Sequence, residues 1–243
     1  MTSRWLICFS ALFGLWAGSP QQAPHAGEVT GTVELVNSND PATRRNHNYS
    51  GVVLWLEPTP RPASLPLAPQ RVVMEQKNQR FVPHVMAVPM GSTVDFPNND
   101  VVRHNVFSIA SGQVFDLSLY PPGQSRSVTF RYRGIVRVYC NIHSTMSAVI
   151  AVLDTPWYAV TQAGGDFVIA HVPPGDYVLH MFHERALPER LALIQPKISV
   201  GEDGLALPLI TISETGVVQP PHPDKHGEPY PAAPRYPTGG GGN

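Results

Sequence analysis

The sequence predicts an all-β protein, on three observations. Proline accounts for 26 of the 243 residues, about twice the usual share of ~5%, and proline removes a backbone donor and breaks helices. Apolar runs such as GTVELV, GVVLWLE and SAVIAVL are short and rich in β-branched residues, which is typical of strands. Gly-Gly and Pro-Pro-Gly steps punctuate the runs between residues 164 and 182, and their chemistry favours hairpin reversals.

The charge of the chain gives no reason to expect nucleic acid or an anionic membrane surface as a partner. Charged residues make up 14% of the chain, and the formal net charge is -1. Proteins that bind polyanions through electrostatic attraction carry an excess of Lys and Arg. We therefore expect a protein that binds no nucleic acid.

Residues 1–26 have the layout of a secretory signal peptide. Arg4 precedes an apolar run from Trp5 to Ala17, and small and polar residues follow. The run is too short to span a bilayer comfortably. The sequence therefore predicts a periplasmic or secreted protein with no stable membrane span after removal of the signal.

The segment VRVYCNIHSTMSAVIAV, residues 136–152, places Cys140, His143 and Met146 at three-residue steps where a strand ends. Because Cys8 falls inside the expected signal peptide, Cys140 is the single cysteine of the mature chain and has no internal disulfide partner. A thiolate, an imidazole and a thioether form a soft ligand set that suits copper, above all Cu(I). The alternative is that the thiol and the thioether are merely core side chains.

A mononuclear electron-transfer copper site needs two histidines and one cysteine in a trigonal arrangement, with a weak axial methionine. The CNIHSTM loop supplies three of these four ligands. A compact loop does not offer all four ligands to one ion, so the missing histidine comes from a distant strand. His104, in NNDVVRHNVFS, is the candidate.

Residues 70–154 resemble a cupredoxin, and among cupredoxins the amicyanin and plastocyanin branch. The resemblance lies in RFVPHVMAVPMGSTVDFPNND, in RHNVFS and in SVTFRYRGIVRVYCNIHSTM. The spacing of the cysteine, histidine and methionine agrees with the short loop of amicyanin. The resemblance implies a Greek-key β-sandwich that holds one mononuclear copper per chain.

The same resemblance assigns a role to each site residue. His104, Cys140 and His143 would be the strong equatorial ligands, and Met146 the weak axial one. Asn105 would lie just outside the ligand set and tie the two ligand-bearing loops together. Such outer contacts orient ligands and tune the metal.

The segment GGDFVIAHVPPGDYVLHMF resembles the carboxypeptidase regulatory-like, transthyretin-like β-sandwich. That family begins with a G-x-V strand and a second apolar strand, which GTV and GVVLWLE supply. We therefore expect a discontinuous sandwich of residues 28–58 and 155–213, interrupted after the proline-rich linker PTPRPASLPLAPQ by the cupredoxin domain, residues 70–154. The simpler alternative gives the early strands to the copper domain.

Two further segments carry expectations about packing. In SAVIAVL, residues 147–153, the residues expected on both faces of the strand are apolar, whereas a half-exposed strand alternates apolar and polar residues. We therefore expect the second unit to cover the outer face of this strand. Residues 214–243 are rich in proline and glycine, and we expect a disordered or extended tail.

The remaining histidines are interpreted as structural. His84 lies inside an apolar run and should be packed or bonded to a partner. His180 and His183 are three residues apart, which on a strand places them on opposite faces, so they should not chelate together. His222 and His226 lie in the tail and are assigned no function.

Four protein ligands leave no open coordination position, and the expected mature chain has neither an H-x-H pair nor a second cysteine for further copper ions. This pattern favours an electron carrier over an enzyme. Resemblance to amicyanin implies a c-type cytochrome and a periplasmic dehydrogenase as redox partners. Two alternatives stay open: a periplasmic protein that stores, delivers or senses copper, and an interaction module whose cupredoxin domain holds no metal.

Overall fold

The computed structural model describes residues 27–217 and 222–230. The expected signal peptide, residues 1–26, lies outside the described residues. Strands dominate the described chain, with two short helices, so the predicted all-β class is confirmed. Within the described residues, no helix combines the length and the apolar character needed to cross a membrane.

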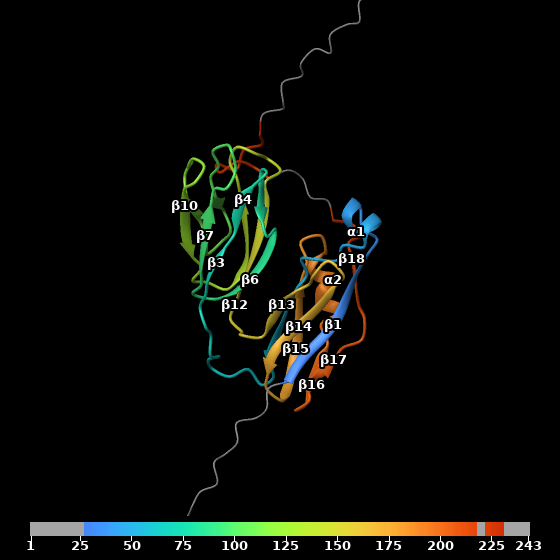
Figure 1. Cartoon of the computed structure of the whole chain (residues 1–243). Coiled ribbons are helices and arrows are strands. Elements are labelled where there is room, and N and C mark those ends of the chain that lie inside the picture. Colours follow the sequence, from blue (N-terminus) through green and yellow to red (C-terminus); the bar gives the residue numbers. More distant parts are fainter. Residues whose placement is uncertain (1–26, 218–221, 231–243) are drawn as a thin grey trace, which may run out of the picture.

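The strands form two units, which stand side by side in Figure 1. The flanking unit comes from the two ends of the described chain and consists of β1 (Gly27–Val36), α1 (Pro41–Asn46), β2 (Val53–Pro58), β13 (Tyr158–Val160), β14 (Asp166–Val172), β15 (Gly175–Phe182), α2 (Pro188–Leu193), β16 (Lys197–Val200), β17 (Leu205–Ala206) and β18 (Ile210–Ser213). The inserted unit consists of β3 (Arg71–Val73), β4 (Glu75–Lys77), β5 (Arg80–Val82), β6 (Val85–Pro89), β7 (Thr93–Pro97), β8 (Phe107–Ser108), β9 (Phe115–Asp116), β10 (Ser125–Thr129), β11 (Gly134–Tyr139) and β12 (Ser147–Leu153).

The flanking unit is a sandwich of two sheets. One has the order β14-β1-β17, with β18 also paired to β1, and the other has the order β13-β2-β15-β16. Inward side chains of both sheets share one core, among them Val33, Leu54, Ile169 and Leu179. β1 pairs with β14, and β2 pairs with β15. Each sheet therefore combines a strand that precedes the inserted unit in the sequence with one that follows it.

The turn between β14 and β15 differs from the hairpin that the sequence indicates. The two strands belong to different sheets of the sandwich, so the Pro-Pro-Gly step carries the chain from one sheet to the other. The reason is burial: Phe167 and Ile169 on β14 and Leu179 and Met181 on β15 enter the same core from opposite sides. β14 finds backbone partners in β1, and β15 finds them in β2 and β16.

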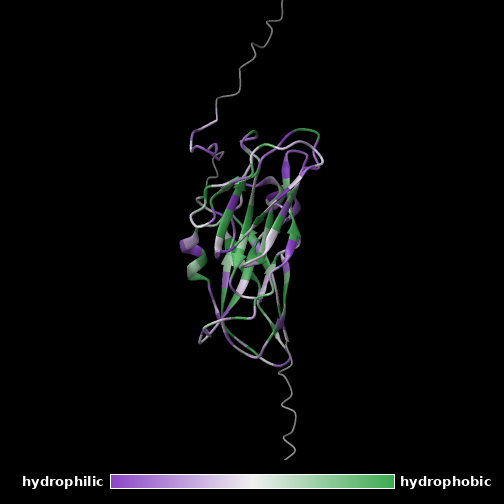
Figure 2. Cartoon of the chain, turned by 90° about the vertical axis from the view of Figure 1, so that its left-hand side faces the viewer, coloured by the Kyte–Doolittle hydropathy of each residue, from purple (hydrophilic) through white to green (hydrophobic). Residues whose placement is uncertain are grey.

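The inserted unit also has two main sheets, with orders β6-β12-β11-β8-β9 and β10-β7-β3, and a small β4–β5 hairpin. Its core includes Phe81, Phe96, Phe130 and the sulfur-bearing residues Cys140 and Met146. Figure 2 shows that hydrophobic residues concentrate on the strands of the two units, while hydrophilic residues concentrate in the connections.

Strand β12 is buried on both faces, as its sequence predicts. Ala148, Ile150 and Val152 point into the core of the inserted unit, whereas Ala151 and Leu153 pack with Val53 of the flanking unit in a separate junction cluster. Alternate residues of a strand point to opposite faces, so one apolar run serves two cores. The expectation that the second unit covers this strand is confirmed.

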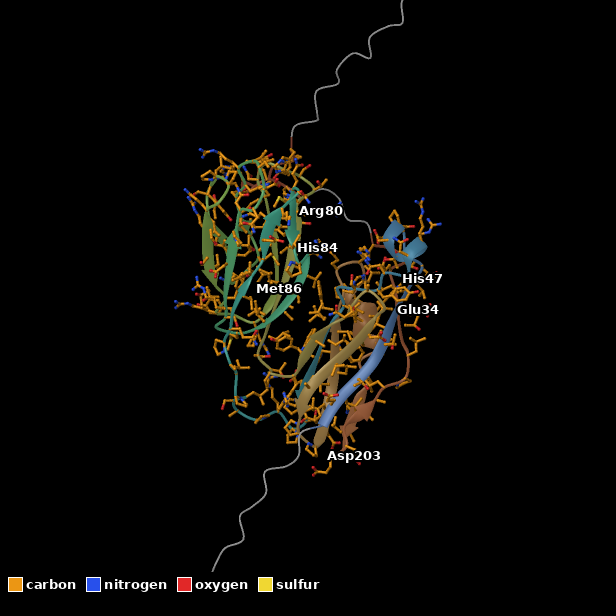
Figure 3. All side chains as sticks on the ribbon, viewed as in Figure 1. Glu34, His47, Arg80, His84, Met86 and Asp203 are labelled. Carbon is orange, nitrogen blue, oxygen red and sulfur yellow. The ribbon has the colours of Figure 1, made fainter. Side chains whose placement is uncertain are left out.

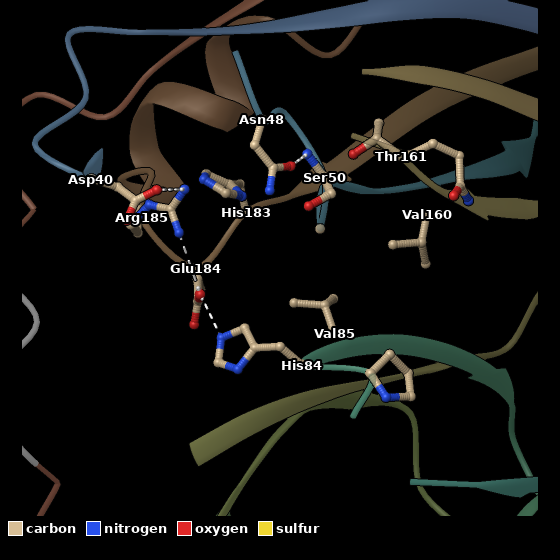
Figure 4. A pocket seen from close by; sticks show the side chains of 13 residues that line it. Asp40, Asn48, Ser50, His84, Val85, Val160, Thr161, His183, Glu184 and Arg185 are labelled. Carbon is tan, nitrogen blue, oxygen red and sulfur yellow. Dashed lines mark hydrogen bonds and ion pairs between the residues drawn. The ribbon is translucent and has the colours of Figure 1, made fainter. Parts of the chain in front are cut away.

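A cavity of about 360 Å³ lies where the two units meet. His84 and Val85 line it from the inserted unit, and Thr161, Glu184 and Arg185 line it from the flanking unit (Figure 4). Figure 3 places His84 on the side of the inserted unit that faces the flanking unit. Apolar and charged contacts therefore both hold the junction.

Candidate metal centre

The CNIHSTM segment forms the loop that joins β11 to β12. The two strands are antiparallel neighbours, and their pairing ends at Tyr139 and Ser147. Inside the loop, the Cys140 N–H donates to the Met146 carbonyl at 3.0 Å, and the Met146 N–H donates to the His143 carbonyl at 2.9 Å. These bonds fold the loop back on itself and gather the three expected ligand residues at one end of the sheet.

His104 reaches the same end of the inserted unit from a different segment. Its backbone exchanges two hydrogen bonds with Tyr120, at 3.2 and 2.9 Å. Three residues later, Phe107 on β8 pairs with Tyr139 on β11, the residue before Cys140. Sheet pairing therefore brings His104 beside the loop although 36 residues separate it from Cys140.

The structure brings His104, Cys140 and His143 into one cluster. The Cys140 Sγ lies 3.6 Å from Nδ1 of His104 and 3.8 Å from Nδ1 of His143. All three ligand atoms lie within 4.8 Å of one another, and in the described part of the chain this is the one such group of metal-binding side chains. His104 and Cys140 are buried, and His143 is half-buried.

The spacing of these atoms fits a bound metal ion. Bonds of about 2.1 Å to nitrogen and about 2.3 Å to sulfur, arranged trigonally around one ion, separate the sulfur from each nitrogen by about 3.8 Å. The measured separations from sulfur are 3.6 and 3.8 Å. One thiolate and two imidazole nitrogens at this spacing, with a buried thioether in the same loop, resemble a type 1 copper site.

Met146 completes the loop from its buried side. Its side chain is 1% exposed and belongs to the same apolar core as Cys140. Its backbone is bonded to both Cys140 and His143, so its position follows from the fold of the loop itself.

Asp100 controls which nitrogen of His104 faces the cluster. Its Oδ2 lies 2.9 Å from His104 Nε2, so that nitrogen carries the proton and donates it to the carboxylate. Nδ1, which faces Cys140, is then left with its lone pair free for a metal. A hydrogen bond from the Gln79 backbone N–H, together with the one from His104 and against burial, lowers the pKa of Asp100 to about 2.

Asn105 joins the two ligand-bearing segments. Its Oδ1 accepts a hydrogen bond from the backbone N–H of Asn141, the residue after Cys140, and its Nδ2 donates to Asp116 at 3.3 Å. The side chain is buried. Asn105 therefore ties the His104 segment through its amide group to the loop of residues 140–146, which carries the expected copper ligands and is here called the copper loop.

The pKa of His143 is lowered, which favours the neutral form of the imidazole. Burial, and then the charge of the neighbouring His104, lowers the pKa of His143. The rings of the two histidines lie 4.9 Å apart between centroids. Since metals bind the neutral imidazole, a lowered pKa favours binding.

His84, His180 and His183 have structural partners, as expected. His84 is bonded to Glu184 and to the Ser147 carbonyl. His180 stacks on Trp55, with ring centroids 5.3 Å apart. His183 lies 2.8 Å from Glu214 and does not join His180.

The sequence assigned no function to His222, yet the structure places it beside the cluster. It is 9% exposed, and its Nε2 lies 3.2 Å from the carbonyl oxygen of His143. Residues 214–243 were expected to form a disordered or extended tail, whereas residues 222–230 pack against the inserted unit, where they appear in red in Figure 1. This segment is rich in proline and polar residues. It shows neither the apolar spacing of a helix nor the apolar alternation of a strand, so nothing in its sequence indicates the contact.

Asp100 was likewise missed, since nothing in the sequence distinguishes it from other loop carboxylates.

Comparison with known proteins finds similarity to cupredoxins over part of the chain. No protein-family model matches the sequence, and no curated protein matches it. A purple cupredoxin from Nitrosopumilus maritimus is 23% identical, with a TM-score of 0.32, and the match covers 34% of this chain and 99% of that one. An oxidised amicyanin variant is 21% identical, with a TM-score of 0.32, over 34% of this chain and 82% of its own. A reduced amicyanin variant is 22% identical, with a TM-score of 0.33, over 36% and 87%.

Proposed function

We propose that this protein is a mononuclear blue-copper protein that transfers single electrons between redox partners. The observation that carries the proposal is the position of the Cys140 sulfur, 3.6 and 3.8 Å from one nitrogen of each of two histidines. Copper bound there would supply a one-electron couple between Cu(II) and Cu(I). His104, Cys140 and His143 are the proposed strong ligands, and Met146 the proposed weak one.

The protein's own side chains prepare this site for a carrier role. Asp100 orients the His104 ring, Asn105 joins the two ligand segments, and the buried core around Cys140 excludes water. A rigid site that is closed on its buried side rearranges little when its charge changes, which favours rapid electron exchange over substrate chemistry. We therefore propose a carrier and not an enzyme.

The edge near His143 is the proposed contact surface for redox partners. His143 is the most exposed of the three ligand residues, and Ile142 beside it exposes an apolar side chain, as does Val101 near His104. Exposed apolar side chains close to the ligand residues suit the brief encounters of electron-transfer proteins. A c-type cytochrome and a periplasmic dehydrogenase are the proposed partners, in keeping with the signal-like segment of residues 1–26.

We also assign the flanking unit to the carboxypeptidase regulatory-like, transthyretin-like class. The support is the GGDFVIAHVPPGDYVLHMF pattern together with a two-sheet sandwich into which both β14 and β15 bury their apolar residues. Its proposed role is to hold the inserted unit through the junction cluster.

The test of copper binding is the visible absorption and EPR spectrum after one equivalent of Cu(II) is added to the purified protein. We expect an intense thiolate-to-copper band that disappears in Cys140→Ser and in His104→Ala. His47→Ala is the matched control, because His47 is exposed on the flanking unit, and it should retain the full band. A full blue spectrum in His104→Ala would refute the ligand assignment.

A second measurement separates electron transfer from copper storage. Stopped-flow mixing of the copper-loaded protein with a reduced c-type cytochrome should bleach the blue band at a rate that rises with cytochrome concentration. A protein that binds copper but exchanges no electrons with cytochromes would instead be a storage, delivery or sensing protein.

A further inference from the structure

Residues 222–230, here called the tail strap, lie across the loop that bears Cys140 and His143. In Figure 1 the strap is the red segment at the upper end of the inserted unit. The strap is a compact turn, because the Asp224 side chain accepts hydrogen bonds from the backbone N–H groups of His226 and Glu228. The Asp224 N–H also donates to the Glu228 carbonyl at 2.8 Å.

The tail strap contacts the copper loop at three residues, 140, 141 and 143. The Tyr230 hydroxyl donates to the Cys140 carbonyl at 3.0 Å, and His222 Nε2 lies 3.2 Å from the His143 carbonyl oxygen, to which it donates when it carries a proton. Between them, the Lys225 N–H donates to Oδ1 of Asn141 at 2.9 Å. Two of the three contacts therefore reach the backbone of residues whose side chains are proposed ligands.

Aromatic packing seats the strap on the sheet below the loop. The His222 ring lies 4.5 Å from the Tyr139 ring, at an angle of 31°, and 6.1 Å from the Phe107 ring. Tyr230 meets the His222 ring edge-on, 5.4 Å away. Since Tyr139 precedes Cys140 in the chain, the strap also packs against the start of the copper loop.

An ion pair links the strap to the Asn105 network. Lys225 Nζ lies 2.8 Å from Oδ2 of Asp116, and Oδ1 of Asp116 accepts a hydrogen bond from the Asn105 side chain. Asn105 in turn accepts from the Asn141 backbone. The strap, the Asp116 segment, Asn105 and the copper loop are therefore linked in a closed circuit of contacts.

We propose that the tail strap positions the copper loop and slows its local opening, so that it sets how fast copper leaves the site. This inference rests on the proposed copper site but concerns residues outside the ligand set. A loop held only by its own turn opens readily. Each intramolecular hydrogen bond opposes opening by about two- to tenfold, and the strap adds bonds at residues 140, 141 and 143.

Two conservative variants test the proposal without removing the packing. Tyr230→Phe deletes the hydroxyl that bonds the Cys140 carbonyl but keeps the ring. His222→Phe deletes the bond to the His143 carbonyl and keeps a ring on Tyr139. His226→Ala is the control, because the exposed side chain of His226 lies in the same strap while its backbone holds the strap's own turn.

Two readouts are taken from the full chain. In the copper-loaded protein we expect release to an excess of chelator to be about two- to tenfold faster in each variant, with a shifted thiolate-to-copper band. In the metal-free protein we expect faster hydrogen exchange at the amides of residues 141–146. The His226→Ala protein should match the unaltered one in both readouts.

The two readouts separate this inference from the proposed function. Unchanged copper release and unchanged amide exchange in both variants would overturn the strap's role while leaving the copper site intact. If the unaltered protein gave no type 1 spectrum, the proposed function would fail, and amide exchange in the metal-free protein would still decide the strap's role.

Discussion

The Nε2 atom of His84 lies 2.7 Å from Oε1 of Glu184, and this contact joins the inserted unit to the flanking unit (Figure 4). The other ring nitrogen, Nδ1, lies 2.9 Å from the carbonyl oxygen of Ser147. Both nitrogens therefore face acceptors, and only the doubly protonated imidazolium donates to both. The Glu184 hydrogen bond, against the effect of burial, raises the pKa of His84.

The first prediction is a pH-dependent junction. Because the pKa of His84 is raised on folding, its stabilising contribution is fully present below its unfolded pKa, about 6.5, and is lost as pH rises through the folded value. His84→Gln should lower Tm by about 1–3 °C at pH 6 and by less at pH 9, since His84 is partly exposed and the pair is screened. Calorimetry at both pH values measures the difference.

The matched control for this prediction is His226→Gln, in an exposed residue away from the junction. Its Tm should follow that of the unaltered protein at both pH values. An equal loss of Tm at pH 6 and pH 9 in His84→Gln would show that packing and not protonation holds the contact.

The second prediction concerns the orientation of His104. Asp100→Asn keeps the size of the side chain but removes the carboxylate that holds the proton on His104 Nε2. Removal of such a partner typically costs 10- to 100-fold in metal affinity, so we expect a loss of about that size. Competition with a chelator measures it. Asp203→Asn, in an exposed turn, is the control and should bind copper as the unaltered protein does; affinity unchanged in Asp100→Asn would contradict the prediction.

The third prediction concerns the tie between the ligand segments. Asn105→Ala leaves the Asn141 N–H without its side-chain acceptor in a largely buried place. We expect the free energy of unfolding of the metal-free protein to fall by about 1–3 kcal/mol, as measured by urea denaturation. Asn99→Ala removes an exposed side-chain amide a few residues before Asn105. It should lower the free energy of unfolding by less than about 0.5 kcal/mol. Equal costs in the two variants would argue against a specific tie.

The fourth prediction concerns the junction cluster. Leu153 is 5% exposed and packs with Val53 of the other unit. Leu153→Ala should lower the free energy of unfolding by about 2–5 kcal/mol, because the cavity left behind cannot fully collapse. Leu193→Ala, at a site 86% exposed, should change it by about 0.5 kcal/mol or less. A small effect at Leu153 would mean that the units associate weakly.

Features that depend on neighbouring residues could be predicted from the sequence. The burial of β12 on both faces follows from its unbroken apolar run, because alternate side chains of a strand must enter two different environments. The three-residue steps from Cys140 to Met146 likewise place their side chains in one short loop. The hairpin expectation for β14 and β15 was wrong because turn chemistry specifies a reversal and not which strands then pair.

Features that depend on distant residues were decided by the tertiary structure. The pairing of Lys225 with Asp116, 109 residues apart, and the seating of His222 on Tyr139 arise from the packing of distant segments. A local pattern carries no information on such contacts, since a loop carboxylate or a proline-rich tail looks the same in sequence with or without a partner. The ligand types can be recognised in the chain, whereas the shell that orients them exists only once the strands have paired.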